Sequence, residues 1–556
     1  MKRILLSGYF ILIMTVLVTA QWVEQATGFA TQSRGINHLY VVSPGVAWAT
    51  AYDGATTSNI VQEFTRTADG GATWTAGYIN GATGLSPCMM FALDENNAWV
   101  PMYDSANGGG KLMRTSDGGS NWVQQAPAAF AAPSGFPDIV HFWDSGKGIC
   151  MGDPTGGYFE IYTTTDGGDN WVRVPDANIP SNLSGEWGYT DVYSVVGNTI
   201  WFGTNKGRIF KSTDFGNTWT VFSTAINNIA YMVFVNDFKA FICNRNTTTG
   251  KYESLKMTED GGATWQALSF TGPLYNNDMC YVPGTTNTFV STGSDWQDPT
   301  DLGSSYSLDF CQTWTDIIPG DTVQYLAVDF YDNTTGWSGQ FSSSPTMGGI
   351  MKFVDNSILT SHNNPSGNDG SVIGYRNTPY PFLPGDFVFT DPDSHAFAGI
   401  VIMSLVSTGT LKYAGNDVVL YTKCPDITQL VFTPVNEEFG YPYTAFTYKV
   451  ADETGAYSDQ TYTMTINVSE EYGINNAFTG NKLEAFPNPF HTDVNVTIPD
   501  DNNSIAIVLC DITGKIVREC NPGATTLVIN RNGLSNGIYY LKVSGNRSYV
   551  SKLVVY

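Results

Sequence analysis

The octet TEDGGATW, residues 258 to 265, is typical of a tight turn between two short strands, and five near copies of it occur along the chain. The six octets end at Trp74, Trp122, Trp171, Trp219, Trp265 and Trp314, so successive copies lie 46 to 49 residues apart. Between the copies, short alternating apolar runs are broken by Gly, Asn and Asp. This period and content are typical of a four-stranded blade, so the sequence predicts an all-β propeller.

The number of blades follows from a second apolar element. It lies about 25 residues before each Trp and occurs seven times, from GVAWAT (45–50) to TTGWSGQ (334–340). The seventh repeat ends near GGIMKFV (348–354) without a Trp strand of its own. Because QWVEQA (21–26) matches the strand that follows each octet, we expect it to complete a seventh blade and close the ring, which leaves no free sheet edge.

Each octet position has a structural task. The third-position carboxylate can accept backbone N–H groups, the fifth-position Gly supplies a positive φ, and the Trp packs under the turn. We therefore predict structural roles for Asp69, Asp117, Asp166, Asp214, Asp260 and Asp309. In the sixth octet Cys311 replaces the fifth-position Gly, so we expect this turn to be the most distorted.

With these features, residues 67 to 314 resemble the Asp-box, or BNR, repeat family, whose pattern is S/T-x-D-x-G-x-T-W. That family includes sialidases, xyloglucan-cleaving hydrolases, sortilin-type receptors and photosystem assembly factors. The resemblance therefore implies a fold and not an activity. The run KSTDFGNTW (211–219) is most similar to the seven-bladed, non-enzymatic members that resemble photosystem II assembly factors.

Composition and the N-terminus bear on location and partners. The chain of 556 residues carries 51 acidic and 27 basic residues, which argues against a nucleic-acid partner. Residues 1 to 20, MKRILLSGYFILIMTVLVTA, are typical of a secretory signal peptide, with a retained membrane anchor as the alternative. We expect the exported chain, with its propeller at residues 21–355, to have no membrane span and to be a monomer.

The eight cysteines form no CxxC pair, which argues against a zinc cluster or a redox motif. Cys510 and Cys520 flank the turn DITGK (511–515) and are the best candidates for a disulfide. Free buried thiols are the alternative.

Sialidase chemistry requires three arginines around one carboxylate, together with a Tyr, a Glu and an Asp. Arg34 occupies a suitable place for the first arginine. The expected outer-strand positions of Arg66, Arg114 and Arg208 argue against a complete cluster.

Candidate ligand-binding residues lie at the propeller face opposite the octet turns, which we call the loop face. Inner strands start there, and polar residues stand at or near these starts. Aromatic residues on neighbouring loops would suit sugars. The predicted binding residues are Asn37, Asp138, Asp191, Asp278, Gln324, Trp187, Tyr189 and Trp296. Asp138, Asp191 and Asp278 also supply candidate catalytic pairs. Ordinary turn-forming carboxylates are the alternative explanation.

Two strand-rich units are predicted after a linker at 356–376. The first, residues 377–469, is similar to the cadherin-like, Ig-type sandwiches of bacterial surface proteins. Asp391, Asp393 and Asp452 are candidate calcium ligands there, with a solvated turn as the alternative; no other metal or cofactor is expected.

The second unit, residues 483–556, follows a linker at 470–482. It contains AFPNPF (485–490), VLCDITGKIV (508–517), LSNGIYYLKV (534–543) and SKLVVY (551–556). These blocks resemble the type A sorting domain of the type IX secretion system. The resemblance implies a β-sandwich, export through the periplasm to the surface or medium, and the translocon and sorting machinery as partners. The motif residues are Pro487, Asn488, Pro489, Gly514, Gly537, Tyr539 and Lys552.

These observations favour an exported, non-catalytic propeller that binds a carbohydrate or a protein. The alternative function is a secreted glycoside hydrolase that acts on polysaccharide with paired carboxylates. A structural spacer without a small ligand is a third hypothesis.

Overall fold

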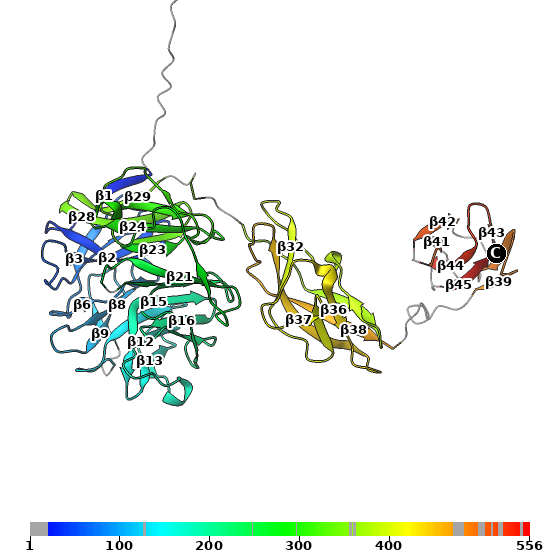
Figure 1. Cartoon of the computed structure of the whole chain (residues 1–556), viewed down its shortest axis with the longest axis horizontal. Coiled ribbons are helices and arrows are strands. Elements are labelled where there is room, and N and C mark those ends of the chain that lie inside the picture. Colours follow the sequence, from blue (N-terminus) through cyan, green and yellow to red (C-terminus); the bar gives the residue numbers. More distant parts are fainter. Residues whose placement is uncertain are drawn as a thin grey trace, which may run out of the picture.

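The computed structural model contains a seven-bladed propeller followed by two β-sandwiches (Figure 1). It describes residues 21–125, 129–246, 248–295, 297–354, 358–359, 363–470, 483–498, 506–512, 515–520, 526–544 and 549–556. The predicted signal peptide lies outside these residues, as do Trp296, Gly514 and the second linker from residue 471 onward. Among the described residues, no helix is long and apolar enough to span a membrane.

Each blade is an antiparallel sheet whose strands run outward from the ring axis in chain order. The first four blades are β2 (Arg34–Ser43), β3 (Val46–Asp53), β4 (Glu63–Thr67) and β5 (Thr75–Tyr78); β6 (Ser86–Pro87), β7 (Phe91–Ala92), β8 (Ala98–Tyr103), β9 (Gly110–Thr115) and β10 (Val123–Gln125); β11 (Pro137–Phe142), β12 (Gly148–Thr155), β13 (Tyr158–Thr164) and β14 (Val172–Arg173); and β15 (Gly188–Val196), β16 (Thr199–Thr204), β17 (Arg208–Ser212) and β18 (Thr220–Ser223).

The remaining three blades follow the same order, except that the N-terminal β1 is the outermost strand of the seventh. They are β19 (Ile229–Phe234), β20 (Ala240–Arg245), β21 (Tyr252–Thr258) and β22 (Gln266–Leu268); β23 (Asp278–Tyr281), β24 (Phe289–Ser294), β25 (Leu302–Ser307) and β26 (Thr315–Asp316); and β27 (Val328–Asp332), β28 (Thr335–Ser344), β29 (Met347–Phe353) and β1 (Trp22–Ala26). Short 3-10 turns η1 (Asp176–Asn178) and η2 (Pro299–Asp301) lie between strands.

The N-terminal strand closes the ring. β1 pairs antiparallel with β29, in a register from Trp22 opposite Phe353 to Ala26 opposite Gly349. The Trp22 ring is buried and contacts Phe353 at 5.2 Å between ring centroids. The prediction that this strand completes the seventh blade is therefore confirmed.

The octets form the turns between the third and fourth strands of six blades. In the first octet, Thr67 Oγ1 donates to Asp69 Oδ1 at 2.9 Å and accepts the Gly71 N–H at 2.8 Å. Asp69 also accepts the Thr73 N–H and hydroxyl, at 2.9 and 2.7 Å. These bonds hold the pKa of Asp69 below its usual range. Equivalent bonds recur in the other five octets, with the side-chain amide of Asn121 or Asn170 in place of the Thr73 hydroxyl in the second and third.

The expected distortion of the sixth octet is wrong. Phe310 and Cys311 both adopt left-handed conformations, with φ of 60° and 67°. Cys311 still donates its N–H to Ser307 Oγ at 3.0 Å, and its side chain is fully buried. A left-handed non-Gly residue costs about 1–2 kcal/mol. The complete set of turn bonds and the buried thiol offset this cost, so the turn keeps its shape.

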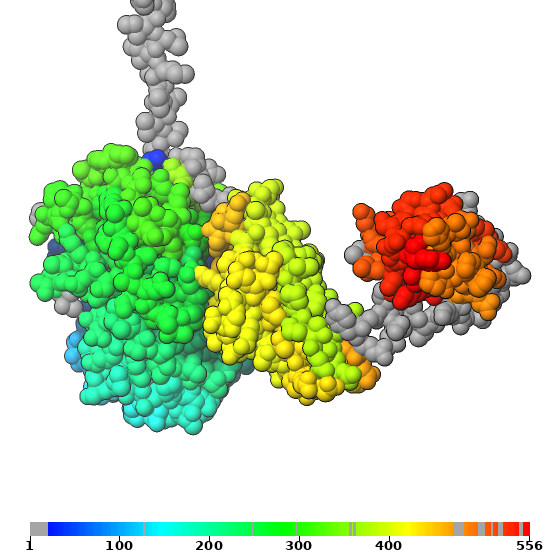
Figure 2. Space-filling model, turned by 45° about the vertical axis from the view of Figure 1, so that its right-hand side comes forward, coloured from blue at the N-terminus to red at the C-terminus, as the bar shows by residue number. Residues whose placement is uncertain are grey.

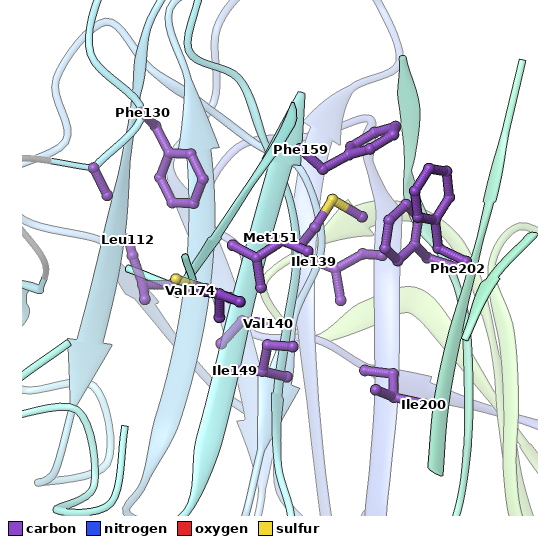
Figure 3. Packing of buried hydrophobic residues seen from close by; sticks show 14 of the residues in the cluster. Leu112, Phe130, Ile139, Val140, Ile149, Met151, Phe159, Val174, Ile200 and Phe202 are labelled. Atoms are coloured by element: carbon purple, nitrogen blue, oxygen red, sulfur yellow. The ribbon is translucent and has the colours of Figure 1, made fainter. Parts of the chain in front are cut away.

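The propeller core consists of layers of large side chains between the blades. Figure 3 shows Ile139 and Met151 of the third blade beside Phe202 of the fourth. Four second-strand tryptophans are fully buried, and a cation from the third strand lies over each ring: Arg66 over Trp48, Arg114 over Trp99, Lys211 over Trp201 and Lys352 over Trp337. This cation–π contact is thus repeated in four blades.

The second unit is a sandwich of two sheets. One sheet has the strand order β30 (Gly370–Tyr375), β38 (Tyr462–Ser469), β37 (Gly440–Asp452), β32 (Phe397–Ile402) and β35 (Lys423–Cys424). The other has the order β31 (Tyr380–Pro381), β36 (Leu430–Thr433), β33 (Thr410–Tyr413) and β34 (Asn416–Asp417). The 3-10 turns η3 (Pro384–Asp386) and η4 (Ile427–Gln429) connect strands.

The predicted linker at 356–376 needs correction. Residues 370–375 form β30, which pairs in parallel with β38, and Val372 is buried in the sandwich core. The preceding Asn, Pro and Gly residues suggested a linker, but the alternating burial of SVIGY fits an edge strand.

The third unit packs a three-stranded sheet, β39 (Glu484–Phe486), β40 (Asp493–Thr497) and β43 (Thr526–Asn530), with a four-stranded one. The latter has the order β42 (Ile516–Cys520), β41 (Ala506–Cys510), β44 (Gly537–Ser544) and β45 (Tyr549–Val555). The expected disulfide is wrong. Cys510 lies opposite Ile516 and Cys520 opposite Ile507, and all eight thiols are free.

The first sandwich packs against the propeller (Figure 2), and its contacts are with the octet-turn side of the fifth blade. The rings of Phe238 and Tyr457 meet edge to face at 4.7 Å, and Lys423 Nζ lies 2.7 Å from Glu259 Oε2 in the fifth octet. The first sandwich therefore contacts the propeller on the side opposite the loop face.

Candidate functional site at the loop face

Irregularities in the inner strands shape the loop face. The pairing register shifts between Ile36 and His38 in β2, and at matching places in β11, β15 and β19. A β-bulge bends a strand and redirects its side chains. Asn37 stands at the first of these bulges and is exposed.

Trp187, an exposed aromatic residue predicted for this face, is held on a rigid loop. Trp187 is 46% exposed. Its backbone N–H donates to Asn205 Oδ1 at 2.9 Å, and its carbonyl accepts the Asn205 N–H at 3.2 Å. The buried Asn205 amide also donates to the Gly185 carbonyl at 2.9 Å. The indole ring is thus presented to solvent by a loop with a fixed backbone.

Two polar side chains lie beside this ring. The Tyr189 hydroxyl donates to Asn228 Oδ1 at 3.0 Å, and the Asn228 N–H donates to the Asn205 carbonyl at 3.0 Å. Burial raises the pKa of Tyr189, while a hydrogen bond from the Trp187 side chain lowers it. Trp187, Tyr189 and Asn228 therefore form one cluster organised by Asn205, which we call the Trp187 platform.

Asp191 follows the platform in the bulge of β15. Its backbone is left-handed, with φ of 61°, and its side chain is exposed. Protein surrounds the carboxyl group although water reaches it. This enclosure raises the pKa of Asp191 well above its usual range, and the nearby charges of Asp278 and Asp329 raise it further.

Asp278 and Asp329 have structural bonds between blades. Asp278 accepts the Val328 N–H at 2.9 Å, and Asp329 accepts the Val41 N–H at 2.7 Å. Their second oxygens accept the N–H groups of Met279 and Phe330, at 2.8 and 2.9 Å. Burial raises the pKa of Asp278 to about 6 and that of Asp329 to about 7. Both carboxyl groups are therefore fixed by the backbone of the ring.

Sequence reasoning missed Asp329, although a signal was present. Asp329 pairs with Trp337 as Tyr40 pairs with Trp48, and both lie eight residues before the tryptophan. Counting eight residues back from the tryptophan position of each second-strand element would have placed Asp329 on the inner strand of the seventh blade.

Asp138 does not reach the loop face, which corrects the prediction. It is 1% exposed, and a Cβ added to Gly188 of the next blade would lie 2.7 Å from its Oδ2 atom. Burial and the neighbouring Asp153 raise the pKa of Asp138 well above its usual range. Burial likewise raises the pKa of Asp153 to about 6. The bulge in β11 turns Asp138 into the interface between blades.

Gln324 is engaged in another blade. Gln324 is half-buried and donates Nε2 to the Ser294 carbonyl at 2.7 Å. Trp296 lies outside the described residues. The structure therefore brings Trp187, Tyr189 and Asp191 together on β15 and its preceding loop, with Asp278 near Asp191.

The arginines do not gather around one site. Arg34 lies 3.3 Å from Asp53 and 2.5 Å from Glu63, and Arg208 pairs with Glu186 at 2.5 Å. Arg66 and Arg114 lie over second-strand tryptophans, as the expected outer positions require. These four arginines are spread over three blades and form no carboxylate-binding triad.

The predicted calcium ligands in the first sandwich are only partly brought together. Oxygens of Asp391 and Asp452 converge with His395 Nδ1, all within 4.8 Å of one another. Asp393 instead accepts the Asn363 N–H at 2.6 Å and its side-chain amide at 2.8 Å. The cluster thus contains an imidazole that the sequence pattern did not indicate.

The sorting-motif residues link the first and last blocks of the third unit. Asn488 donates to the Lys552 carbonyl at 2.6 Å and accepts the Val554 N–H at 2.8 Å, between Pro487 and Pro489. The Tyr539 hydroxyl donates to the Ser535 carbonyl, and Gly537 begins β44 opposite Val555.

Residues 484–556 match the family described as "Secretion system C-terminal sorting domain". The chain is therefore exported by type IX secretion to the cell surface or the medium, and its tail interacts with that machinery. No curated protein matches the chain.

Solved structures include similar folds. One, titled "YCF48 bound to D1 peptide", is 16% identical with a TM-score of 0.43, over 61% of this chain and 98% of that one. YCF48 from Cyanidioschyzon merolae is 15% identical with a TM-score of 0.41, over 60% and 99%. An ancestral GH74 enzyme is 12% identical with a TM-score of 0.39, over 96% of this chain and 64% of that one.

Proposed function

We propose that this chain is an exported, non-catalytic binding protein that takes a glycan on the Trp187 platform. The observation that carries the proposal is an exposed indole ring on a loop fixed by three hydrogen bonds with Asn205. An apolar ring of this size normally becomes buried, so its rigid presentation to solvent favours a ligand that stacks on it.

The polar neighbours favour a sugar over a purely apolar ligand. Tyr189 and Asn228 present a hydroxyl and an amide beside the ring, and Asp191 adds a carboxyl group two residues after Tyr189 on β15. Sugars combine apolar C–H faces with hydroxyl groups, and such sites bind them by stacking and by a few placed hydrogen bonds. Preorganisation by Asn205 reduces the ordering cost of binding.

Hydrolysis by paired carboxylates is the second candidate, and Asp191 and Asp278 are the residues that favour it. Their charges interact, and the pKa of each is raised, as a general acid requires. However, both oxygens of Asp278 accept backbone N–H groups, so we assign it to holding the blades together.

A glycan and polysaccharide array, followed by a reducing-end assay on each bound sugar, tests the proposal on the intact chain. We expect binding without new reducing ends. New reducing ends that are lost in Asp191→Asn would overturn the non-catalytic function. An array without any bound sugar would contradict the glycan proposal and favour a protein ligand.

A further inference from the structure

We propose that Asp391, His395 and Asp452 of the first sandwich form a binding site for a zinc-like divalent transition-metal ion. The three residues come from the loop before β32 and the end of β37, strands that pair with Phe397 opposite Asp452. The Glu453 N–H also donates to the Ala396 carbonyl at 2.9 Å. The sheet therefore fixes the relative positions of the candidate ligands.

Each carboxylate has one oxygen engaged in shaping its own loop. Asp391 Oδ1 accepts the N–H groups of Asp393 and His395, at 2.9 and 3.0 Å. Asp452 Oδ1 accepts the N–H groups of Thr454 and Ala456, at 2.9 and 3.0 Å. The oxygens nearest the imidazole are Asp391 Oδ1, which also makes these loop bonds, and Asp452 Oδ2, which does not make them.

An unpartnered oxygen points to a ligand. The Asp391 side chain is 1% exposed, and its Oδ2 atom has no hydrogen-bond partner among the described residues. A buried carboxylate oxygen without a partner is costly, and a bound cation removes that cost. The Asp452 side chain beside it is also fully buried, which adds a second negative group.

The distances suit one shared ion. His395 Nδ1 lies 3.6 Å from Asp391 Oδ1 and 3.9 Å from Asp452 Oδ2, which is longer than a hydrogen bond. Two ligands of one zinc ion, each about 2.0–2.2 Å from it, lie up to about 4 Å apart. The imidazole and the small number of ligands favour a zinc-like ion, because calcium takes six to eight oxygens.

The test uses the intact, tag-free chain after removal of metal with EDTA. Titration with Zn²⁺, followed by calorimetry, should show one ion per chain, and Co²⁺ should give a visible absorption band from the same site. Asp391→Asn and His395→Gln should weaken Zn²⁺ binding at least tenfold. Asp393→Asn, the matched control, should bind as the wild type does, because Asp393 bonds to Asn363.

If either ligand variant fails to fold, thermal unfolding of the wild type still decides the question. Zn²⁺ should raise the midpoint, and Ca²⁺ at the same concentration should not. Fewer than about 0.2 Zn²⁺ per chain, equal binding by Asp391→Asn and Asp393→Asn, or a midpoint raised by Ca²⁺ alone would each overturn the proposal.

Discussion

Asn205 Oδ1 accepts the backbone N–H of Trp187 at 2.9 Å, so a buried amide just after β16 sets the position of an exposed ring. The same residue holds Asn228 through its carbonyl. One side chain thereby organises the aromatic and polar parts of the Trp187 platform.

Replacing Asn205 should therefore weaken ligand binding and lower stability together. Asn205→Ala leaves the Trp187 N–H and the Gly185 carbonyl without partners, at a cost of about 1–3 kcal/mol. Denaturant unfolding and glycan titration would measure the two effects. Lys206→Ala, at an exposed neighbouring position, is the control and should change neither. Normal glycan binding by a destabilised Asn205→Ala protein would show that Asn205 does not position the binding residues.

Stability should depend on pH because of the carboxyl groups around the ring axis. The pKa values of Asp278 and Asp329 are raised to about 6 and about 7, above the value of about 3.9 for an unfolded chain. The folded state then binds more protons, so the stabilisation present below about pH 4 is lost as the pH rises to about 7. We therefore expect the midpoint temperature of thermal unfolding to decrease as the pH is raised from 5 to 8.

Asp191→Asn should reduce this fall. It removes one of the three like charges, and Asn adopts the left-handed conformation of residue 191 readily. Thermal scans of both proteins at pH 5 and pH 8 would measure the difference. An identical fall in both proteins would show that Asp191 does not interact with the other two acids.

The octet turns should not tolerate a side chain where the preceding blade lies close. Gly216 has φ of 85°, and a Cβ there would lie 2.4 Å from Ile149 Cδ1. Gly216→Ala should cost more than the roughly 1–2 kcal/mol of a left-handed residue. Gly250→Ala, with φ of 70° and open space, should cost only that amount, as urea unfolding would show. Equal costs would contradict the close approach of the third blade.

The contact between the propeller and the first sandwich should depend on its rings more than on its charges. Phe238 is fully buried, and Phe238→Ala removes its contact with Tyr457, so we expect a loss of about 3–5 kcal/mol and faster proteolysis between the domains. Lys423→Ala should cost less than about 1 kcal/mol, because its ion pair with Glu259 is partly exposed. Similar effects of both variants on proteolysis would contradict this ranking.

Asn488 should be needed for export because it joins the first and last blocks of the sorting domain. Asn488→Ala removes its bonds to the Lys552 carbonyl and the Val554 N–H. We expect at least a fivefold loss of chain from the surface and medium, measured by immunoblotting. Asn495→Ala, at an exposed position of β40, should be exported normally. Full export of Asn488→Ala would show that the bridge is dispensable.

The sequence predicted the fold well because the octets determine it locally. The Asp69 carboxylate and Thr67 hydroxyl define a turn within eight residues, and regular repetition of that turn specifies blades. The N-terminal Trp22 strand could likewise be matched to the other outer strands. The sequence could not show that neighbouring bonds would keep the turn at Cys311 intact.

The site was less predictable because it depends on contacts between distant residues. Trp187 and Asp191 could be placed on the loop face from their position in the repeat. The bulge that buries Asp138 beside Asp153, and the role of Asn205 under Trp187, depend on pairing between strands. The sequence did not indicate His395 as a ligand, because His395 lies close to Asp452 only in the folded sheet.

The central claim is tested most directly by comparing the wild type, Trp187→Ala and Phe270→Ala on the same glycan array. Phe270 is the matched control, since it is 38% exposed and follows the outermost strand of the fifth blade. The wild type and Phe270→Ala should bind the same sugars, and Trp187→Ala should bind them at least tenfold more weakly, a loss of about 1.4 kcal/mol. Unchanged binding by Trp187→Ala would contradict the assignment of the glycan site to this face.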